Sequence, residues 1–165
     1  MHLNSRVHRG DQISCPFCQR SFVSATGVTH HLESGSCPEA PNLDREKIYR
    51  AVRSRDPQGS ITKKLLEWNG PSQYTVTDRS WNGYGFECYF CHREFDRLQS
   101  LNQHVNSPAH QQNLYHCPNR GCGLDFKTLA STINHLESES CGFMRFEAVQ
   151  RNMGDLISSN RRLTF

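Results

Sequence analysis

Cysteine and histidine residues recur in this sequence at spacings that suit metal binding. In the central part, two residues separate Cys88 from Cys91, twelve more precede His104, and five more precede His110. Two thiolates on a hairpin and two imidazoles on a helix can close a tetrahedron around Zn²⁺. Four protein ligands leave no coordination position for a substrate, so this spacing predicts a structural zinc site.

Two flanking segments repeat the pattern with cysteine as the last ligand. In the third segment the first two cysteines are four residues apart instead of two. The three sets together use all eight cysteines of the chain, and we therefore predict three structural zinc ions. The predicted ligands are Cys15, Cys18, His31 and Cys37; Cys88, Cys91, His104 and His110; and Cys117, Cys122, His135 and Cys141.

Each predicted site needs a hairpin and a helix to position its ligands, and apolar residues to pack the two together. Three apolar offsets recur in the first two segments and favour His31 over His30 as the ligand, while the third segment has a threonine at the last offset. The core residues are Ile13, Phe22 and Val28; Phe86, Phe95 and Leu101; and Tyr115, Phe126 and Thr132. Bound zinc stabilises such small units by about 10 to 16 kcal/mol. We therefore predict small α+β zinc-stabilised modules, three of the beta-beta-alpha type, joined by a partly helical connector.

The predicted domain organisation follows from these segments. It comprises residues 1–12 as a flexible N-terminus, 13–37 as the first zinc module, 38–85 as a basic, partly helical connector, 86–110 as the second module, 111–141 as a linker and the third module, and 142–165 as a C-terminal helix and tail. Because fifty residues separate Cys37 from Cys88, we expect the first module to be mechanically separate from the others. The segments HLESGSC and HLESESC, at 31–37 and 135–141, differ at one position, which suggests duplication.

Composition and charge exclude several classes of protein. Apolar residues make up only 35% of the chain and the mean hydropathy is −0.72, which argues against one large core. No apolar run resembles a secretory signal or a membrane span, so we expect an intracellular protein that is not secreted and has no membrane partner. The formal net charge of +3 falls to about +1 when eight thiolates and three zinc ions are counted. A uniformly basic protein that coats DNA is thereby excluded, and any nucleic-acid contact must come from local patches.

The connector holds the most basic stretch of the chain, with seven Lys or Arg residues and two acidic residues between positions 45 and 64. We expect a helix over 43–55, capped by Asn42, and a short helix over 61–68, capped by Ser60. The basic side chains form either a solvated helix face or a patch that contacts phosphates. The candidate phosphate contacts are Arg50, Arg53, Lys63 and Lys64.

Weaker signals lie on either side of the second and third modules. Residues 74–77 alternate like a short strand, and residues 81–85 read as an aromatic turn that packs on the second hairpin. Residues 143–157 carry an apolar stripe at helical spacing, which predicts a helix packed on the third module.

The spacing at residues 88–110 resembles the zinc fingers of the CCHH class, and the flanking modules resemble CCHC variants of it. The five-residue gap before His110, with Ser107 inside it, is also similar to the matrin-type fingers of double-stranded-RNA-binding proteins. The whole arrangement resembles fungal multi-finger proteins of uncharacterised activity. The resemblance implies residence in the nucleus. The modules at 13–37, 86–110 and 111–141 are called finger 1, finger 2 and finger 3 below.

In DNA-reading fingers, helix positions −1, 2, 3 and 6 face the bases. In finger 2 these positions hold Arg97, Gln99, Ser100 and Gln103, and the Arg and Gln side chains suit guanine and adenine. Fingers 1 and 3 hold mostly small side chains there, so we expect finger 2 to be the main recognition element. Their positions hold Ser24, Thr26, Gly27 and His30, and Thr128, Ala130, Ser131 and Asn134.

Two functions of different classes remain open. The first is a regulatory module that binds DNA or double-stranded RNA. The second is a scaffold whose fingers and flanking helices bind another protein. Neither catalysis nor a small-molecule substrate is expected, because the predicted zinc sites are closed and no nucleophile and base stand at a meaningful spacing.

Overall fold

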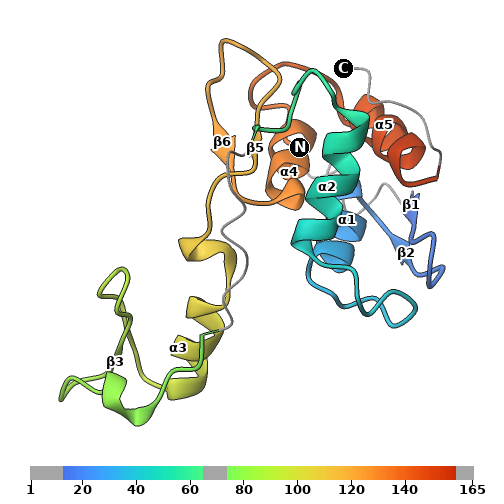
Figure 1. Cartoon of the computed structure of the whole chain (residues 1–165). Coiled ribbons are helices and arrows are strands. Elements are labelled where there is room, and N and C mark those ends of the chain that lie inside the picture. Colours follow the sequence, from blue (N-terminus) through green and yellow to red (C-terminus); the bar gives the residue numbers. More distant parts are fainter. Residues whose placement is uncertain (1–12, 65–73, 159–165) are drawn as a thin grey trace, which may run out of the picture. The chain divides into compact units, whose positions relative to one another are not determined.

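The computed structural model describes residues 13–64 and 74–158 and divides them into two compact units (Figure 1). The first, called the two-finger unit, combines residues 13–64 with 113–158 and so contains fingers 1 and 3. The second, called the central unit, comprises residues 74–112 and contains finger 2. Within these residues no helix is long and apolar enough to cross a membrane.

Each Cys/His segment folds as a two-stranded antiparallel hairpin followed by a helix. The elements are β1 (Ile13–Ser14), β2 (Ser21–Phe22) and α1 (Ala25–Glu33); β3 (Phe86–Glu87), β4 (Glu94–Phe95) and α3 (Leu98–Val105); and β5 (Tyr115–His116), β6 (Asp125–Phe126) and α4 (Leu129–Glu137). In each hairpin the two predicted core residues are paired directly across the strands, for example Phe86 with Phe95. The chain is thus a small α+β protein in which three hairpins and their helices carry the metal-ligand candidates.

The turn that carries the paired cysteines ends with one residue in the left-handed region of the backbone. This residue directly follows the second cysteine and is Gln19 in finger 1, His92 in finger 2 and Gly123 in finger 3, with φ of 60°, 58° and 66°. The carbonyl of the first cysteine accepts a hydrogen bond from the N–H of Gln19 or His92 in the first two turns. This backbone bond closes the turn and brings the two thiols to one side.

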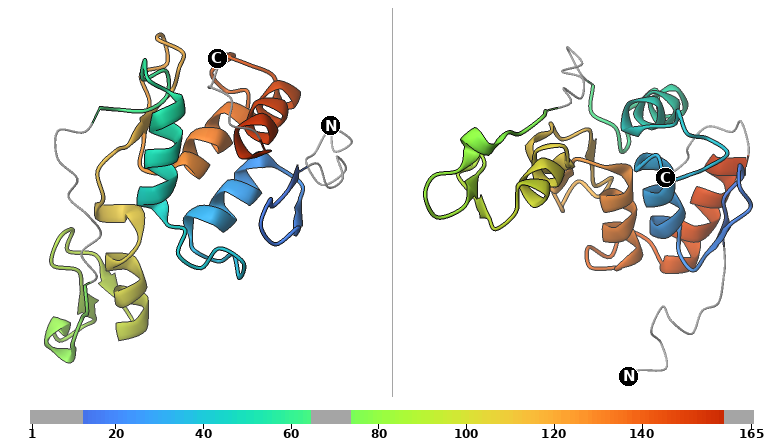
Figure 2. Two further views of the ribbon diagram at one scale, coloured as in Figure 1. Left: turned by 45° about the vertical axis from the view of Figure 1, so that its right-hand side comes forward. Right: turned by 90° about the horizontal axis from the view of Figure 1, so that it is seen from below.

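In contrast to the sequence prediction of a separate first finger, fingers 1 and 3 pack against one another through α1 and α4 (Figure 2). Two glutamates of the repeated HLES sequence hold this pair together. Glu33 at the end of α1 accepts hydrogen bonds from the backbone N–H groups of Leu129 and Ala130 at 2.8 and 2.9 Å. Glu137 at the end of α4 accepts from the N–H of Thr26, at 3.3 Å, and from its hydroxyl, at 2.6 Å. The C-terminal end of each helix is therefore hydrogen-bonded to the N-terminal start of the other.

These contacts satisfy N–H groups that a helix cannot satisfy by itself, because the first turn has no preceding carbonyls. They also place each carboxylate at the positive end of the neighbouring helix dipole. Since Thr26 and Ala130 occupy equivalent positions in the repeat, the arrangement is close to twofold symmetric. Finger 1 is not separate from finger 3, although fifty residues lie between Cys37 and Cys88. The chain returns to the two-finger unit after finger 2, so finger 3 packs against finger 1.

The connector is part of the two-finger unit. Its helix α2 (Arg45–Arg55) is capped by Asp44, which accepts from the Lys47 N–H, so the predicted Asn42 cap is wrong. Buried residues Ile48 and Val52 lie on its inner face, as the apolar spacing predicted. The helix contacts α1, and the guanidinium Nε of Arg45 donates to the Lys127 carbonyl just before α4.

After α2, a buried carboxylate organises the chain. Asp56 accepts hydrogen bonds from the N–H groups of Ser60, Ile61 and Thr62 and from the Thr62 hydroxyl, at 2.7 to 3.0 Å. The bonds hold this segment in an extended turn beside the hairpin of finger 3. The predicted short helix is therefore wrong at 61–64, and its remainder at 65–68 lies outside the described residues.

The extended turn adds a short edge to the hairpin of finger 3. Thr62 forms a bridge with Tyr115, the N–H of His116 donates to the Ile61 carbonyl at 2.8 Å, and the N–H of Lys63 donates to the Leu114 carbonyl at 2.9 Å. Tyr115 is fully buried as a result. Finger 3 thus obtains part of its structure from the connector.

The predicted C-terminal helix is present as α5 (Phe146–Ser158) and contacts both α4 and α1. Its apolar stripe of Phe146, Val149, Met153 and Leu156 is buried, which confirms that prediction. Gln150 accepts a hydrogen bond from the N–H of Ala25 at 2.9 Å and donates to Glu137. The helix therefore packs on the joined pair of fingers and not on finger 3 alone.

In the central unit, the residues before finger 2 cover its small core. Val76 packs with Phe86, Phe95 and Leu101, and the side chain of Asn106 makes hydrogen bonds to the Tyr74 N–H and carbonyl at 3.0 and 2.8 Å. Residues 74–77 form no strand, so that prediction is wrong. Two single-turn helices, η3 (Asp78–Ser80) and η4 (Pro108–His110), precede and end the finger.

Candidate metal centres and nucleic-acid surface

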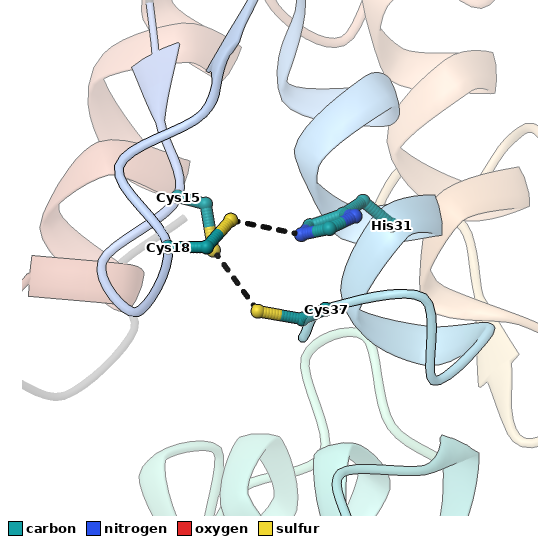
Figure 3. Close-up of side chains that lie close together, drawn as sticks. All are labelled: Cys15, Cys18, His31 and Cys37. Carbon is teal, nitrogen blue, oxygen red and sulfur yellow. Dashed lines mark hydrogen bonds between the residues drawn. The ribbon is translucent and has the colours of Figure 1, made fainter. Parts of the chain in front are cut away.

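The four predicted ligands of finger 1 converge between the β1–β2 turn and α1 (Figure 3). Cys15 Sγ lies 3.8 Å from Cys37 Sγ, and Cys18 Sγ lies 3.4 Å from His31 Nε2. All four donor atoms lie within 4.8 Å of one another. His31 on α1 faces the hairpin, where its ring lies 5.1 Å from that of Phe22. Ser24 caps the first turn of α1 by accepting a hydrogen bond from the Gly27 N–H.

The other two sets converge in the same way. In finger 3, the Cys117 and Cys141 sulfurs are 3.7 Å apart, and Cys122 Sγ lies 3.4 Å from His135 Nε2. In finger 2, the two sulfur–nitrogen pairs are Cys88 with His110, at 3.4 Å, and Cys91 with His104, at 3.3 Å. Each set has its donor atoms within 4.8 Å of one another.

These separations fit a tetrahedral zinc ion. With Zn–S near 2.3 Å and Zn–N near 2.0 Å, tetrahedral edges are about 3.8 Å for two sulfurs and about 3.5 Å for sulfur and nitrogen. A disulfide needs sulfurs about 2.05 Å apart, and every cysteine is free. The donor sets, two thiols with two imidazoles or three thiols with one, are those of structural zinc. The three clusters can therefore each hold one zinc ion.

The protonation of the donors couples metal binding to folding. Burial raises the pKa of Cys15, and burial raises the pKa of Cys117 to about 12. Such thiols keep their protons until zinc displaces them, so metal binding releases protons. Burial lowers the pKa of His31, with Arg20 acting in the same direction, and burial together with His110 lowers that of His104. Both imidazoles are thereby held in the neutral form that can coordinate a metal.

The three centres differ in their exposure. In finger 1, three of the four donors are buried, whereas in finger 2 Cys91 is exposed and both histidines are only partly covered. Finger 2 therefore has the most open of the three metal centres. Its cover includes the ring of Phe90 in the hairpin turn, whose centroid lies 5.0 Å from that of the His110 ring.

Packing of α1 on α4 covers part of the predicted base-reading surface of fingers 1 and 3. Position −1 of finger 1, Ser24, is buried, and position 2, Thr26, is bonded to Glu137. Position 2 of finger 3, Ala130, is buried against the Glu33 carboxylate. Position 6 is exposed in both helices, as His30 and Asn134, and position 3 is exposed in finger 3 alone, as Ser131.

Finger 2 keeps its four predicted positions accessible within the central unit. Arg97, Gln99 and Gln103 are exposed, and Ser100 is half-buried. Helix α3 turns Leu101 and Val105 into the core, which leaves the glutamines on the opposite face. The structure thus brings these side chains together on one surface.

The basic candidates of the connector are largely engaged within the protein. Arg50 pairs with Glu46 one helical turn away, and Lys63 pairs with Asp125 of the finger 3 hairpin. Arg53 donates to the Asp56 carbonyl and to the Thr62 hydroxyl, both at 2.9 Å, and so supports the turn beside finger 3. Lys64 is exposed.

Sequence reasoning missed four residues that hold the two-finger unit together: Glu33, Glu137, Asp56 and Gln150. A signal for the first two was present, because both glutamates belong to the repeated HLES sequence. Asp56 and Gln150 carry no comparable signal, since their partners are distant in the sequence or are backbone groups.

Comparison with known proteins finds zinc-finger proteins. Zinc finger E-box-binding homeobox 2 of Homo sapiens is 24% identical over 149 residues, which cover 85% of this chain and 11% of the relative. Zinc finger protein ehn-3 of Caenorhabditis elegans is 33% identical over 54 residues, 33% of this chain and 21% of the relative. Transcription factor IIIA of Mus musculus is 38% identical over 42 residues, 26% of this chain and 12% of the relative.

The chain thus matches from 11% to 21% of the length of these relatives. No known family profile matches the chain, and no solved structure matches it. The likeness to zinc-finger proteins and the geometry of the three clusters together identify a zinc-binding protein with three structural zinc ions.

Proposed function

We propose that this protein is a nuclear, nucleic-acid-binding regulatory module in which finger 2 is the main recognition element. Each finger is a beta-beta-alpha unit that holds one zinc ion through four of the twelve ligands predicted from the sequence. The names of two relatives, an E-box-binding homeobox protein and a transcription factor, support binding to nucleic acid. Zinc keeps the hairpin and helix of each finger together, and no catalytic step is assigned to these four-ligand sites.

One observation supports finger 2 above the others. Fingers 1 and 3 use the starts of their helices on each other, through Glu33 and Glu137, whereas α3 contributes to no such pair in the described residues. A finger reads bases with the start of its helix. Two of the three fingers therefore have this region occupied, and only finger 2 can insert its helix into a groove without breaking internal contacts.

The side chains of α3 then decide what is read. Arg97 suits the two acceptors of guanine, and Gln99 or Gln103 suits the donor and acceptor of adenine. One finger of this kind covers about three base pairs. Lys64 is exposed, and Arg50 is exposed although it pairs with Glu46, so these two are the remaining candidates for phosphate contacts.

The test compares equivalent helix positions in different fingers. Gln103 in finger 2 and Asn134 in finger 3 are both exposed amides at position 6, so Asn134→Ala is a matched control for Gln103→Ala. The zinc-loaded full chain is titrated by fluorescence anisotropy with DNA and RNA duplexes enriched from random pools. Arg97→Ala or Gln103→Ala should weaken binding by roughly fivefold to a hundredfold, whereas Asn134→Ala should leave it unchanged. Equal losses for Gln103→Ala and Asn134→Ala would refute the leading role of finger 2.

A further inference from the structure

The eight cysteines of the chain all lie in the described residues, and they differ in how far solvent reaches them. Cys91 of finger 2 is exposed, whereas the equivalent second cysteines of fingers 1 and 3, Cys18 and Cys122, are partly covered. The other cysteine of the finger 2 turn, Cys88, is fully buried in one cluster with Leu101. Cys91 is therefore the only exposed cysteine of the eight.

The exposed cysteine lies beside a second cysteine with which it can form a disulfide. Cys88 and Cys91 stand on one turn, which the His92 N–H closes by donating to the Cys88 carbonyl at 2.8 Å. Their sulfurs belong to one donor set, whose atoms lie within 4.8 Å of one another. In a tetrahedral zinc site two sulfurs are about 3.8 Å apart, whereas a disulfide joins them at about 2.05 Å. Bound zinc and a disulfide therefore exclude each other in this turn.

We infer that the Cys88–Cys91 pair is a peroxide-sensitive switch: hydrogen peroxide oxidises the two thiolates to a disulfide and releases zinc from finger 2 alone. The Cys91 thiolate attacks one peroxide oxygen; an S–O bond forms, the O–O bond breaks, and the departing hydroxide takes a proton and becomes water. The Cys88 thiolate then attacks the Cys91 sulfur; the S–S bond forms, the S–O bond breaks, and a second hydroxide leaves, again as water. The two thiolates lose two electrons in total, and the peroxide gains them.

Two properties of the fingers oppose each other in deciding which zinc ion is lost first. Fingers 1 and 3 hold three thiolates for each zinc ion, one more than finger 2, and the additional thiolate favours oxidation there. Access favours finger 2. In finger 1, Cys15 and Cys37 are 0% and 1% exposed, so hydrogen peroxide reaches them only after local opening, and in finger 3 no cysteine is exposed. The hydrogen bonds of Glu33 and Glu137 between α1 and α4 oppose that opening, and we therefore expect access to decide.

Loss of the finger 2 zinc ion removes the link between α3 and its hairpin. Among the described residues of the central unit, the buried hydrophobic cluster consists of Cys88, Leu101 and Val105. So small a core depends on bound zinc to stay folded. The side chains of α3 then no longer form one surface. The resulting loss of nucleic-acid binding rests on the proposed function, whereas the oxidation itself does not.

The test adds hydrogen peroxide in steps to the zinc-loaded full chain and counts the bound zinc ions by native mass spectrometry. Alkylation of the remaining thiols, followed by peptide mapping, locates each disulfide. The first product should keep two zinc ions, contain a Cys88–Cys91 disulfide and no longer bind an enriched DNA or RNA duplex. A thiol reductant and added zinc should restore the third zinc ion. Absence of duplex binding before peroxide is added would contradict the proposed function only, because zinc loss and the disulfide are measured without nucleic acid.

Cys91→His removes the exposed thiolate but keeps four ligands at the site. This variant should retain three zinc ions at the peroxide dose that removes one from the unsubstituted chain. The matched control is Cys18→His, which changes the equivalent position of finger 1 and should still lose the finger 2 zinc ion at that dose.

The inference is overturned if the first zinc ion leaves finger 1 or finger 3, or if reductant and zinc do not reverse the loss. It is also overturned if Cys91→His loses zinc at the same dose as the unsubstituted chain, or if Cys18→His protects finger 2 equally well. If Cys91→His binds fewer than three zinc ions before peroxide is added, the position of the first disulfide in the unsubstituted chain decides by itself.

Discussion

The Glu33 carboxylate at the end of α1 accepts a hydrogen bond from the backbone N–H of Ala130 at the start of α4, at 2.9 Å. The same repeat position in α4, Glu137, returns the contact to Thr26. Two fingers that lie a hundred residues apart in the sequence are thereby joined end to start. A zinc finger is usually considered an independent unit, but here two of them share one folded structure.

Loss of either glutamate should destabilise the two-finger unit. Glu33→Ala leaves the N–H groups of Leu129 and Ala130 without their acceptor, and this should lower the free energy of unfolding by about 1 to 3 kcal/mol. Burial raises the pKa of Glu33, against the Leu129 and Ala130 N–H groups and Arg45, so its charge depends on these partners. Urea unfolding of the zinc-loaded protein measures the change. The control is Glu46→Ala, which removes an exposed helix pair with Arg50 and should cost less than about 0.5 kcal/mol.

Loss of zinc from finger 1 should destabilise helix α4 of finger 3. Without zinc the hairpin and α1 separate, so α4 loses the helix against which it is packed. Native mass spectrometry should show three zinc ions in the intact chain and two in Cys15→Ser. In this variant the amide protons of α4 should exchange faster with solvent, whereas the exchange rate of the α3 amide protons should not change.

The matched variant is Cys88→Ser in the central unit. It should also bind two zinc ions. The amide protons of α3 should exchange faster, and the exchange rate of those in α4 should stay the same. Unchanged exchange in α4 of Cys15→Ser would show that the helix pair does not couple the two fingers.

Asp56 should stabilise the turn that supports finger 3 throughout the neutral range. Burial raises the pKa of its carboxyl, but hydrogen bonds from Ile61, Ser60 and Thr62 outweigh burial, and the net pKa is lowered. A carboxyl with a lowered pKa contributes stability above its unfolded value of about 3.9 and loses it as the pH falls through the folded value. Asp56→Asn should therefore reduce stability by about 1 to 3 kcal/mol. The reduction should be the same at pH 7 and pH 5 in thermal unfolding, and a reduction that shrinks by pH 5 would contradict the lowered pKa.

Local patterns in the sequence were enough to predict the hairpins, their helices and the convergence of each Cys/His set. This worked because the spacing of ligands and of core residues such as Phe86 and Leu101 is set within about 25 residues by one hairpin and one helix. Thr132 did not disturb the pattern, since its hydroxyl donates to the Thr128 carbonyl and the residue is fully buried.

The arrangement of the fingers could not be predicted in this way. The partner of Glu33 is a pair of backbone N–H groups, which leave no mark in the sequence of α4. The spacing of Ile61 and Leu65 predicts a helix after Asp56, whereas four hydrogen bonds to the Asp56 carboxylate fix a different backbone at residues 60–62. The prediction of a separate finger 1 rests on distance along the chain, which does not determine distance in space.

The length of the recognised site tests the central claim most directly. The zinc-loaded full chain is used to select duplexes from random pools, and the number of specified base pairs is counted in the enriched sequences. If finger 2 alone inserts its helix, about three adjacent base pairs should be specified, and the preference should change with Arg97→Ala or Gln103→Ala. A specified site of about nine base pairs that changes with His30→Ala and Asn134→Ala would show that all three helices read bases. That result would contradict the joined pair of fingers 1 and 3 as the form that binds nucleic acid.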